Sequence, residues 1–145
     1  MKGSRGEMRK LVLGVAGASG VIYAIRMLEV LSAVKNVETH LVMTNAARMT
    51  IALETDLAVS EVEEMADVQY RLNDVGAAIA SGSFITMGMV VIPCSMKTLS
   101  GIANSYSANL LMRAADVTLK DPRPLIIVPR ETPLHLGHLR LMTAA

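Results

Sequence analysis

Glycine and serine occur near the start of the chain at a spacing that could hold an anionic ligand. The stretch GVAGASGVIYAI, residues 14–25, follows an apolar run and leads into a helical pattern, with glycines at 14, 17 and 20. Glycines let the backbone approach a ligand, and Ser19 can cap the helix while neighbouring amides face a phosphate or a ring carbonyl. Because the spacing is G-x-x-G-x-x-G and not the dinucleotide G-x-G-x-x-G, a tight turn with a helix cap explains it equally well.

A second candidate anion site follows a continuous apolar stretch in the middle of the chain. Residues 93–98 read PCSMKT, where Ser95, Lys97 and Thr98 supply hydroxyl, ammonium and amide donors at a predicted helix start. Thr44 precedes another predicted helix in the same way. Helix capping explains each segment taken alone, but two such segments beside one sheet favour a bound ligand.

Charged residues mark two further positions. Arg130 and Glu131 lie between two prolines, which would hold a cation and a carboxylate in fixed places. Arg113, Asp116 and Lys120 fall at i, i+3 and i+7, so one helix face carries two cations with an acid between them. The simplest interpretation of this second group is a solvated, salt-bridged surface.

The sequence favours neither a metal site nor a thiol nucleophile. Cys94 has no histidine near it in sequence and follows an apolar strand, so we interpret it as a buried thiol. His40 lies in a predicted strand, and His135 and His138 share a helical or turn region. We interpret all three histidines as structural, and we expect no metal ligand cluster.

The elements that position these residues alternate between short apolar strands and helices. We predict strands at 10–16, 38–43, 89–92 and 125–128, and helices at 21–34, 45–54, 60–67 and 98–120, the last with a weak point near Asn104 and Ser105. Residues 73–88 form a loop in this interpretation. The pattern predicts a doubly wound, mainly parallel α/β sheet of the Rossmann/flavodoxin-like class, with ligands beyond the carboxyl ends of the strands.

Length and composition bound the remaining possibilities. The 145 residues are enough for one domain at 10–145, preceded by an N-terminal extension at 1–9. With 52% hydrophobic residues, 19% charged residues and a net charge of +1, we expect a homo-oligomer and no nucleic-acid partner. We expect a cytoplasmic protein without a membrane partner, because we find no signal-peptide pattern and no apolar run long enough for a span.

Seven short motifs run through most of the chain. They are GASG at 17–20, ETHLVM at 38–43, LETD at 53–56, SGSF at 81–84, PCSMKTLSGI at 93–102, RAADVTLK at 113–120 and PRETPLHLGHLRLM at 129–142. In this order the set resembles the flavin prenyltransferases, which were long described as aromatic-acid or octaprenyl-hydroxybenzoate decarboxylases. Each motif alone is modest, whereas the ordered set is specific.

The resemblance implies particular roles for residues in these motifs. The implied FMN-binding residues are Gly17, Ala18, Ser19, Thr44, Ser95, Met96, Lys97, Thr98 and Arg130. Thr44 stands where the family usually has serine, and it keeps the hydroxyl. The implied contacts of the prenyl phosphate are Arg113, Lys120 and Arg130. The implied catalytic residues are Glu54, Glu131 and Ser19, with Glu54 assisting the removal of a proton.

The implied reaction transfers dimethylallyl from dimethylallyl monophosphate to N5 and C6 of reduced FMN. It needs no metal if fixed cations stabilise the charge that develops on the departing phosphate. The resemblance further implies a dodecamer and a partner decarboxylase that receives the prenylated FMN.

Two alternatives stay open, and the chain is shorter than the family pattern. Family members continue beyond the position of Ala145 with a strand, a Pro-rich segment containing a Tyr, and a helix whose Arg also contacts the prenyl phosphate. We therefore expect the C-terminal part of the fold to be missing and the 145-residue chain to bind FMN loosely with little turnover. The alternatives are a non-catalytic FMN-binding subunit of a decarboxylase system and a flavin-dependent cysteine decarboxylase. The usual active-site His and Met-rich substrate motif of the latter are not evident.

Overall fold

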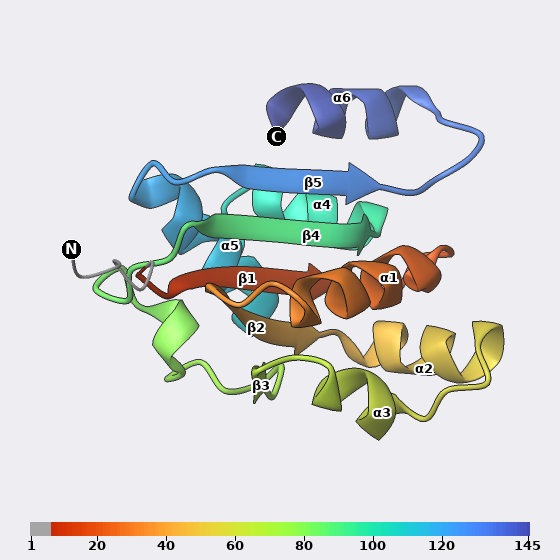
Figure 1. Ribbon diagram of the computed structural model, residues 1–145. Helices are drawn as coiled ribbons and strands as arrows, with labels where there is room; N and C mark the ends of the chain where they lie inside the picture. Colours follow the sequence, from red (N-terminus) through yellow and green to blue (C-terminus); the bar gives the residue numbers. More distant parts are fainter. Residues whose placement is uncertain (1–6) are drawn as a thin grey trace.

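Five parallel strands form the single sheet of the computed structural model, which describes residues 7–145 (Figure 1). The strands are β1 (Arg9–Val15), β2 (Val37–Met43), β3 (Val68–Tyr70), β4 (Gly88–Cys94) and β5 (Leu125–Pro129). Their order is β3-β2-β1-β4-β5, and every neighbouring pair is parallel. The predicted doubly wound α/β class is confirmed. Residues 1–6 of the expected extension lie outside the described residues, and β1 begins at Arg9.

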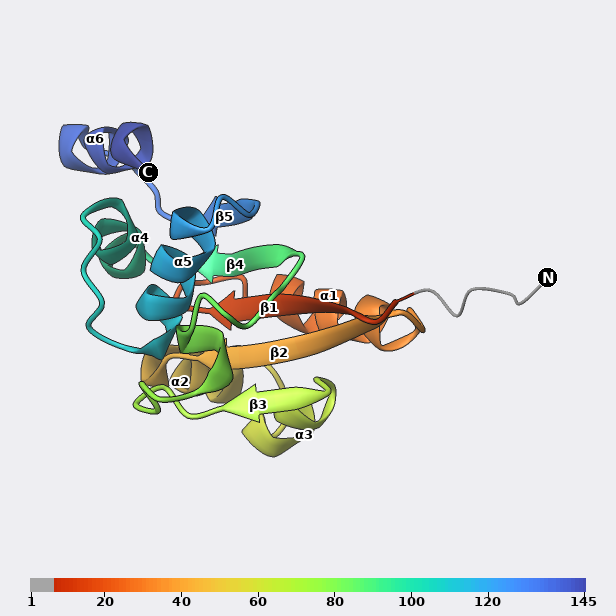
Figure 2. The same cartoon turned by 90° about the vertical axis from the view of Figure 1, so that its left-hand side faces the viewer.

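Helices connect the strands and lie on both faces of the sheet. They are α1 (Val21–Ser32), α2 (Asn45–Glu54), α3 (Val59–Glu64), α4 (Met96–Ala103), α5 (Leu110–Lys120) and α6 (Leu136–Ala144), with a short 3₁₀ turn, η1 (Ala78–Ala80). Figure 2 shows α1 on one side of the sheet and α5 on the other. Parallel neighbours need such crossovers, because a tight turn cannot return the chain to the same end of the sheet.

Side chains of β1 point alternately into two separate hydrophobic cores. Leu13 and Val15 pack with α1 and with Ile51 of α2, whereas Val12 packs with Leu111 of α5. Both cores consist of aliphatic side chains that are almost completely buried. Burial on both faces explains why the strand reads as an unbroken apolar run and not as an alternating pattern.

The main differences from the sequence prediction concern the helix at 98–120, β3, α3 and β5. The predicted helix at 98–120 is two helices, and the break falls at the predicted weak point, where Ser105 adopts a positive φ of 53°. The short strand β3 was not predicted, and α3 ends at Glu64 and not at 67. β5 is an edge strand with Ile126 56% exposed, although we predicted a buried strand.

β1 and β4 are neighbours at the centre of the sheet. From β1 the chain adds β2 and β3 on one side and then returns to add β4 and β5 on the other, so the strand order reverses between β1 and β4. Doubly wound sheets bind ligands at this point, beyond the carboxyl ends of the strands.

Among residues 7–145, no helix is both long and apolar enough to cross a membrane.

Candidate functional site

Backbone hydrogen bonds tie the carboxyl ends of four strands together. The amide of Thr44 donates to the carbonyl of Val15 (3.0 Å), and the amide of Ala16 donates to the carbonyl of Pro93 (3.1 Å). Arg130, after β5, donates its amide to the carbonyl of Cys94 at the end of β4 (3.1 Å). The loops that follow β1, β2, β4 and β5 therefore lie beside one another, as the sequence predicted.

Five of the predicted FMN-binding residues line one pocket of about 150 Å³ at this edge. They are Gly17, Thr44, Ser95, Lys97 and Thr98. Five residues that sequence reasoning missed complete the lining: Asn45, Ala46, Leu72, Asn109 and Met112. Residues from five separate segments of the chain thus converge on one cavity.

Three helix N-termini point their amide groups toward this pocket. Thr44 Oγ1 accepts a hydrogen bond from the amide of Ala47 at the start of α2 (3.0 Å). Ser95 Oγ accepts one from Thr98 in α4 (3.2 Å), and the Asn109 side chain accepts one from Met112 in α5 (2.9 Å). Each N-terminus carries a partial positive charge, so the pocket favours an anion such as a phosphate.

The loop after β1 lies too close to α2 for a side chain at position 17. A Cβ atom added to Gly17 would lie 2.8 Å from the carbonyl carbon of Ala46 and would clash with the Ala46 side chain. Gly20 caps α1 with a φ of 99°, a conformation that side chains rarely adopt. The two glycines therefore let the loop lie against α2 and turn into α1.

Ser19 and Glu54 form the one contact between predicted catalytic residues. Ser19 Oγ donates to Glu54 Oε1 (3.0 Å), and the amide of Gly20 donates to Glu54 Oε2 (3.2 Å). Both side chains are exposed, although they are far apart in sequence. The carboxylate at the end of α2 is thereby fixed to the glycine loop, at a solvent-accessible place where it can exchange a proton.

The distance between the anion pocket and Glu54 suits an elongated ligand. Asn45 and Glu54 are the first and last residues of α2, so about 14 Å of helix separates them. A flavin mononucleotide has a phosphate at one end and an aromatic ring system at the other. The donor set at the pocket fits the phosphate.

Comparison with known proteins decides between families that share this arrangement. A family model described as Flavoprotein matches residues 2–142. The flavin prenyltransferase UbiX of Escherichia coli (strain K12) is 59% identical over 138 residues, which cover 95% of this chain and 73% of that protein. The chain belongs to the flavin prenyltransferase family.

Two solved structures of family members superpose on this fold. AnUbiX, crystallised in complex with FMN and dimethylallyl pyrophosphate, has a TM-score of 0.93 and 46% identity over 95% of this chain and 73% of that chain. A dodecameric FMN-dependent UbiX-like decarboxylase from Escherichia coli O157:H7 has a TM-score of 0.92 and 50% identity over 93% and 73%. The FMN-dependent cysteine decarboxylase TvaF is 18% identical, which shows the fold alone.

The structure does not bring Arg113 and Lys120 to the pocket between the helix N-termini. Arg113 Nε donates to the carbonyl of Ala80 (3.3 Å), and its guanidinium pairs with Asp116 (3.5 Å). Lys120 is the last residue of α5, about 15 Å along the helix from its start. Neither cation lines the pocket, and their predicted contact with the prenyl phosphate stays a prediction.

Arg130 and Glu131 lie where the sequence places them, directly after β5, and both are exposed. The amide of Arg130 is tied to Cys94, and Glu131 Oε1 accepts a hydrogen bond from the amide of Thr132 (3.1 Å). Neither side chain lines the pocket. Arg130 is next to the β4 loop and could reach a ligand that extends beyond it.

Ala18 and Met96, which we also predicted to bind FMN, do not line this pocket. The amide of Ala18 donates to the carbonyl of Ala16 (2.8 Å), which tightens the loop. Met96 is the first residue of α4 and packs on the core shared with α5.

Asn109 was missed because a single helix was predicted across residues 98–120. The signal was present, since an Asn directly before an apolar helix is a typical cap.

Cys94 and His40 are both buried inside the fold. Burial raises the pKa of the Cys94 thiol to about 12, so the thiol stays protonated. His40 is buried and hydrogen-bonded to Glu38 (2.6 Å) and to Tyr70 (2.8 Å). Among the described residues no cluster of three or more His, Cys, Asp and Glu side chains is placed to hold a metal ion.

Proposed function

We propose that the chain binds FMN along the carboxyl edge of the sheet, with the phosphate in the pocket between the three helix N-termini. Thr44, Ser95 and Lys97 supply the hydroxyl and ammonium groups that line this pocket. The flavin ring then lies on the glycine loop, toward Ser19 and Glu54. Family membership and the complex of AnUbiX with FMN support this placement.

We further propose that the flavin is bound in its reduced form and accepts a dimethylallyl group from dimethylallyl monophosphate. The allylic carbon–oxygen bond breaks and its electron pair leaves with the phosphate, while a bond forms to N5 of the flavin. The double bond of the attached group then takes up a proton and forms a second bond to C6, which closes a new ring, and N5 and C6 each lose the proton that they carried. The products are a flavin enlarged by one five-carbon unit and inorganic phosphate.

The fixed carboxylate of Glu54 is the observation that carries this mechanism. Glu54 is held at the glycine loop by Ser19 and by the amide of Gly20, so it can take up and return a proton next to the flavin ring. Ser19 positions this carboxylate. Glu131 and Arg130, after β5, are the proposed second acid and the cation that meets the departing phosphate.

Two further parts of the proposal concern partners. The exposed apolar side chains of α1 and α2 support a homo-oligomer, in agreement with the dodecameric relative. The prenylated FMN is a cofactor for a separate enzyme, and we propose a decarboxylase as its recipient.

Mass spectrometry of the flavin tests the proposed reaction. Protein, reduced FMN and dimethylallyl monophosphate are mixed without metal, and the flavin is extracted and weighed. The test uses the 145-residue chain and, in parallel, the chain extended by the C-terminal segment of a relative, because the relatives are longer. We expect the gain of one five-carbon unit, and the extended chain should be the faster of the two. Bound FMN without this gain in either form would favour the non-catalytic FMN-binding subunit.

A further inference from the structure

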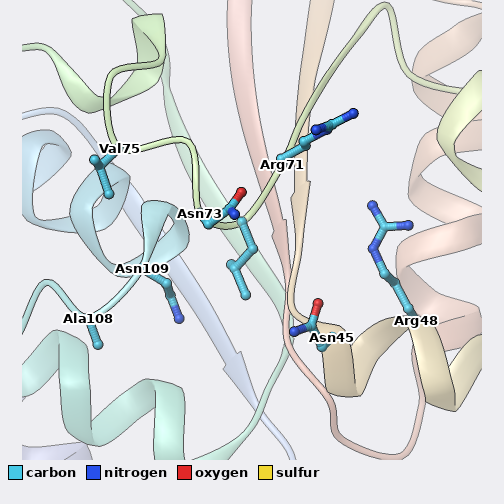
Figure 3. Close-up of a pocket in the computed structure, with 8 residues that line it drawn as sticks. Asn45, Arg48, Arg71, Asn73, Val75, Ala108 and Asn109 are labelled. Carbon is cyan, nitrogen blue, oxygen red and sulfur yellow. The ribbon is translucent and has the colours of Figure 1, made fainter.

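A second, larger cavity adjoins the pocket between the helix N-termini on the side of β3. Its volume is about 510 Å³, and Figure 3 shows the residues that line it. The two cavities share Asn45, Leu72 and Asn109. The proposed reaction gives no role to its other lining residues, which are Arg48, Arg71, Asn73, Val75 and Ala108.

Two arginines give this cavity a cationic wall. Arg48 comes from α2 and Arg71 from the residues after β3, and both lie on the side opposite Val75 and Ala108 (Figure 3). Arg48 forms an ion pair with Glu63 of α3. Arg71 is exposed and makes no ion pair with any residue from 7 to 145. The charge of Arg48 is therefore balanced by a carboxylate, whereas no carboxylate among the described residues pairs with Arg71.

Neutral groups on the cavity wall add to this preference for an anion. Asn45 is the first residue of α2 and Asn109 is the N-cap of α5, so the positive ends of two helices border the cavity. Asn73 adds a further amide, and Asp74, the next residue, does not line the cavity. A guanidinium with several amide donors suits a phosphoryl group, which offers multiple acceptor oxygens.

We propose that this cavity is a second anion site, which binds the phosphoryl group of a phosphate monoester or of inorganic phosphate. It adjoins the pocket that we assign to the FMN phosphate and differs from it by the arginines Arg48 and Arg71. The proposal does not depend on which reaction the flavin undergoes. The volume exceeds that of a phosphate alone, and Leu72, Val75 and Ala108 offer apolar surface to an organic part.

Calorimetric titration of inorganic phosphate and of adenosine monophosphate tests this site in flavin-free and in FMN-saturated protein. We expect saturable binding in both forms, because FMN fills the other pocket. Tighter binding of the monophosphate would identify an organic ester as the natural ligand, and equal binding would identify free phosphate. Affinity should fall as salt is added, since Arg71 is exposed.

Three variants locate the binding. Arg71→Ala should weaken it about tenfold, the effect of losing one hydrogen bond to a charged group. Glu63→Gln should tighten it several-fold because it frees Arg48. Arg26→Ala removes an exposed arginine paired with Glu29 on α1 and should change nothing. Absence of binding, complete displacement by FMN, or an unchanged affinity in Arg71→Ala would overturn the proposal.

Discussion

At the scale of single residues, the contact between Ser19 and Glu54 explains how a carboxylate on α2 can serve a ligand on the loop after β1. The hydroxyl of Ser19 and the amide of Gly20 each hold one carboxylate oxygen. This arrangement fixes the side chain while leaving it open to solvent. Its position, and not its charge alone, is what the proposed proton transfer needs.

Glu54→Gln should slow prenyl transfer much more than it weakens FMN binding. The amide keeps the shape and can still accept the Ser19 hydrogen bond, but it cannot take up a proton. We expect the transfer rate to fall by about a hundredfold or more. The measurement is the rate of five-carbon gain by mass spectrometry, together with an FMN titration.

The matched control is Glu29→Gln, which removes an exposed carboxylate paired with Arg26 on α1. It should leave both the rate and the affinity unchanged. A Glu54→Gln protein that transfers the prenyl group at the normal rate would remove Glu54 from the mechanism.

The buried thiol of Cys94 predicts a loss of stability at high pH. Its pKa is about 12 in the folded chain and has the usual value of 9.0 when exposed, so above pH 9 the unfolded chain binds fewer protons. The free energy of unfolding should then fall by about 1.4 kcal/mol per pH unit from pH 9 toward 12. Urea unfolding at pH 9 and pH 10 measures this slope. Equal slopes in the wild type and in Cys94→Ala would contradict it.

Residue types near the strand ends were predictable from the sequence, but their mutual distances were not. Helix capping was one of two interpretations of Thr44 and Ser95, and both side chains do cap helices. Ser19, which we also expected to be able to cap a helix, does not, because Gly20 is the N-cap of α1 and no side chain caps that helix. The same reasoning did not predict that Arg113 binds the carbonyl of Ala80 and so faces away from the pocket. That contact depends on where the loop at 78–84 crosses α5, which no local pattern encodes.

At the scale of elements, the close approach of the glycine loop to α2 holds the site in shape. The clash that a side chain at Gly17 would make involves Ala46 at the start of α2, including its backbone. Backbone cannot move aside as a flexible side chain can. The loop and the helix N-terminus are therefore fixed relative to each other.

Gly17→Ala should destabilise the protein by about 1–3 kcal/mol and weaken FMN binding, because the added methyl group overpacks this contact. Gly76→Ala is the matched control, since the nearest atom to its added Cβ is Asp74 Oδ1 at 3.9 Å. Urea unfolding and FMN titration of both variants provide the comparison. Equal stability of the two variants would show that α2 can move away from the loop.

The hydrophobic pattern correctly predicted the alternation of strands and helices, but it missed the break within residues 98–120 and the short strand β3. A continuous helical periodicity runs through residues 98–120, and the break between α4 and α5 depends on the turn at Ser105 and Tyr106, whose amide donates to the carbonyl of Gly101 (2.7 Å). β3 pairs over only three residues, too few for a sequence pattern. The break creates the N-terminus of α5. The residues that follow β3 form part of the wall of the anion cavity.

At the scale of the whole molecule, α1 and α2 expose large apolar side chains near the proposed active site. They are Ile22, Tyr23, Met49 and Leu53, and Leu53 is 83% exposed. Ser19 and Glu54 adjoin these residues in sequence. Such a cluster beside polar groups is typical of a surface that another protein covers.

Leu53→Glu should therefore reduce self-association, because a charge in a buried apolar interface is costly. The control is Ile85→Glu, at a similarly exposed apolar residue (77%) in the segment before β4. Analytical ultracentrifugation should give a lower mass for Leu53→Glu alone. A wild-type chain that is monomeric at all concentrations would contradict the expectation.

The overall fold class followed from the sequence because each buried strand is a short apolar run between helical segments. The apolar excess also predicted exposed hydrophobic surface, which the structure places on α1, α2 and β5. Which of these surfaces meets another subunit could not be predicted, since it depends on how distant segments lie side by side.

Comparison of FMN with riboflavin tests most directly the claim that the helix N-termini at the carboxyl edge hold the flavin by its phosphate. Riboflavin lacks that group, so FMN should bind at least about a hundredfold more tightly, given several charge-assisted hydrogen bonds. Lys97→Ala should weaken FMN binding about tenfold while leaving the affinity for riboflavin unchanged, so the ratio of the two affinities should fall about tenfold. Equal binding of FMN and riboflavin by the wild type, or an equal loss of both in Lys97→Ala, would contradict the account.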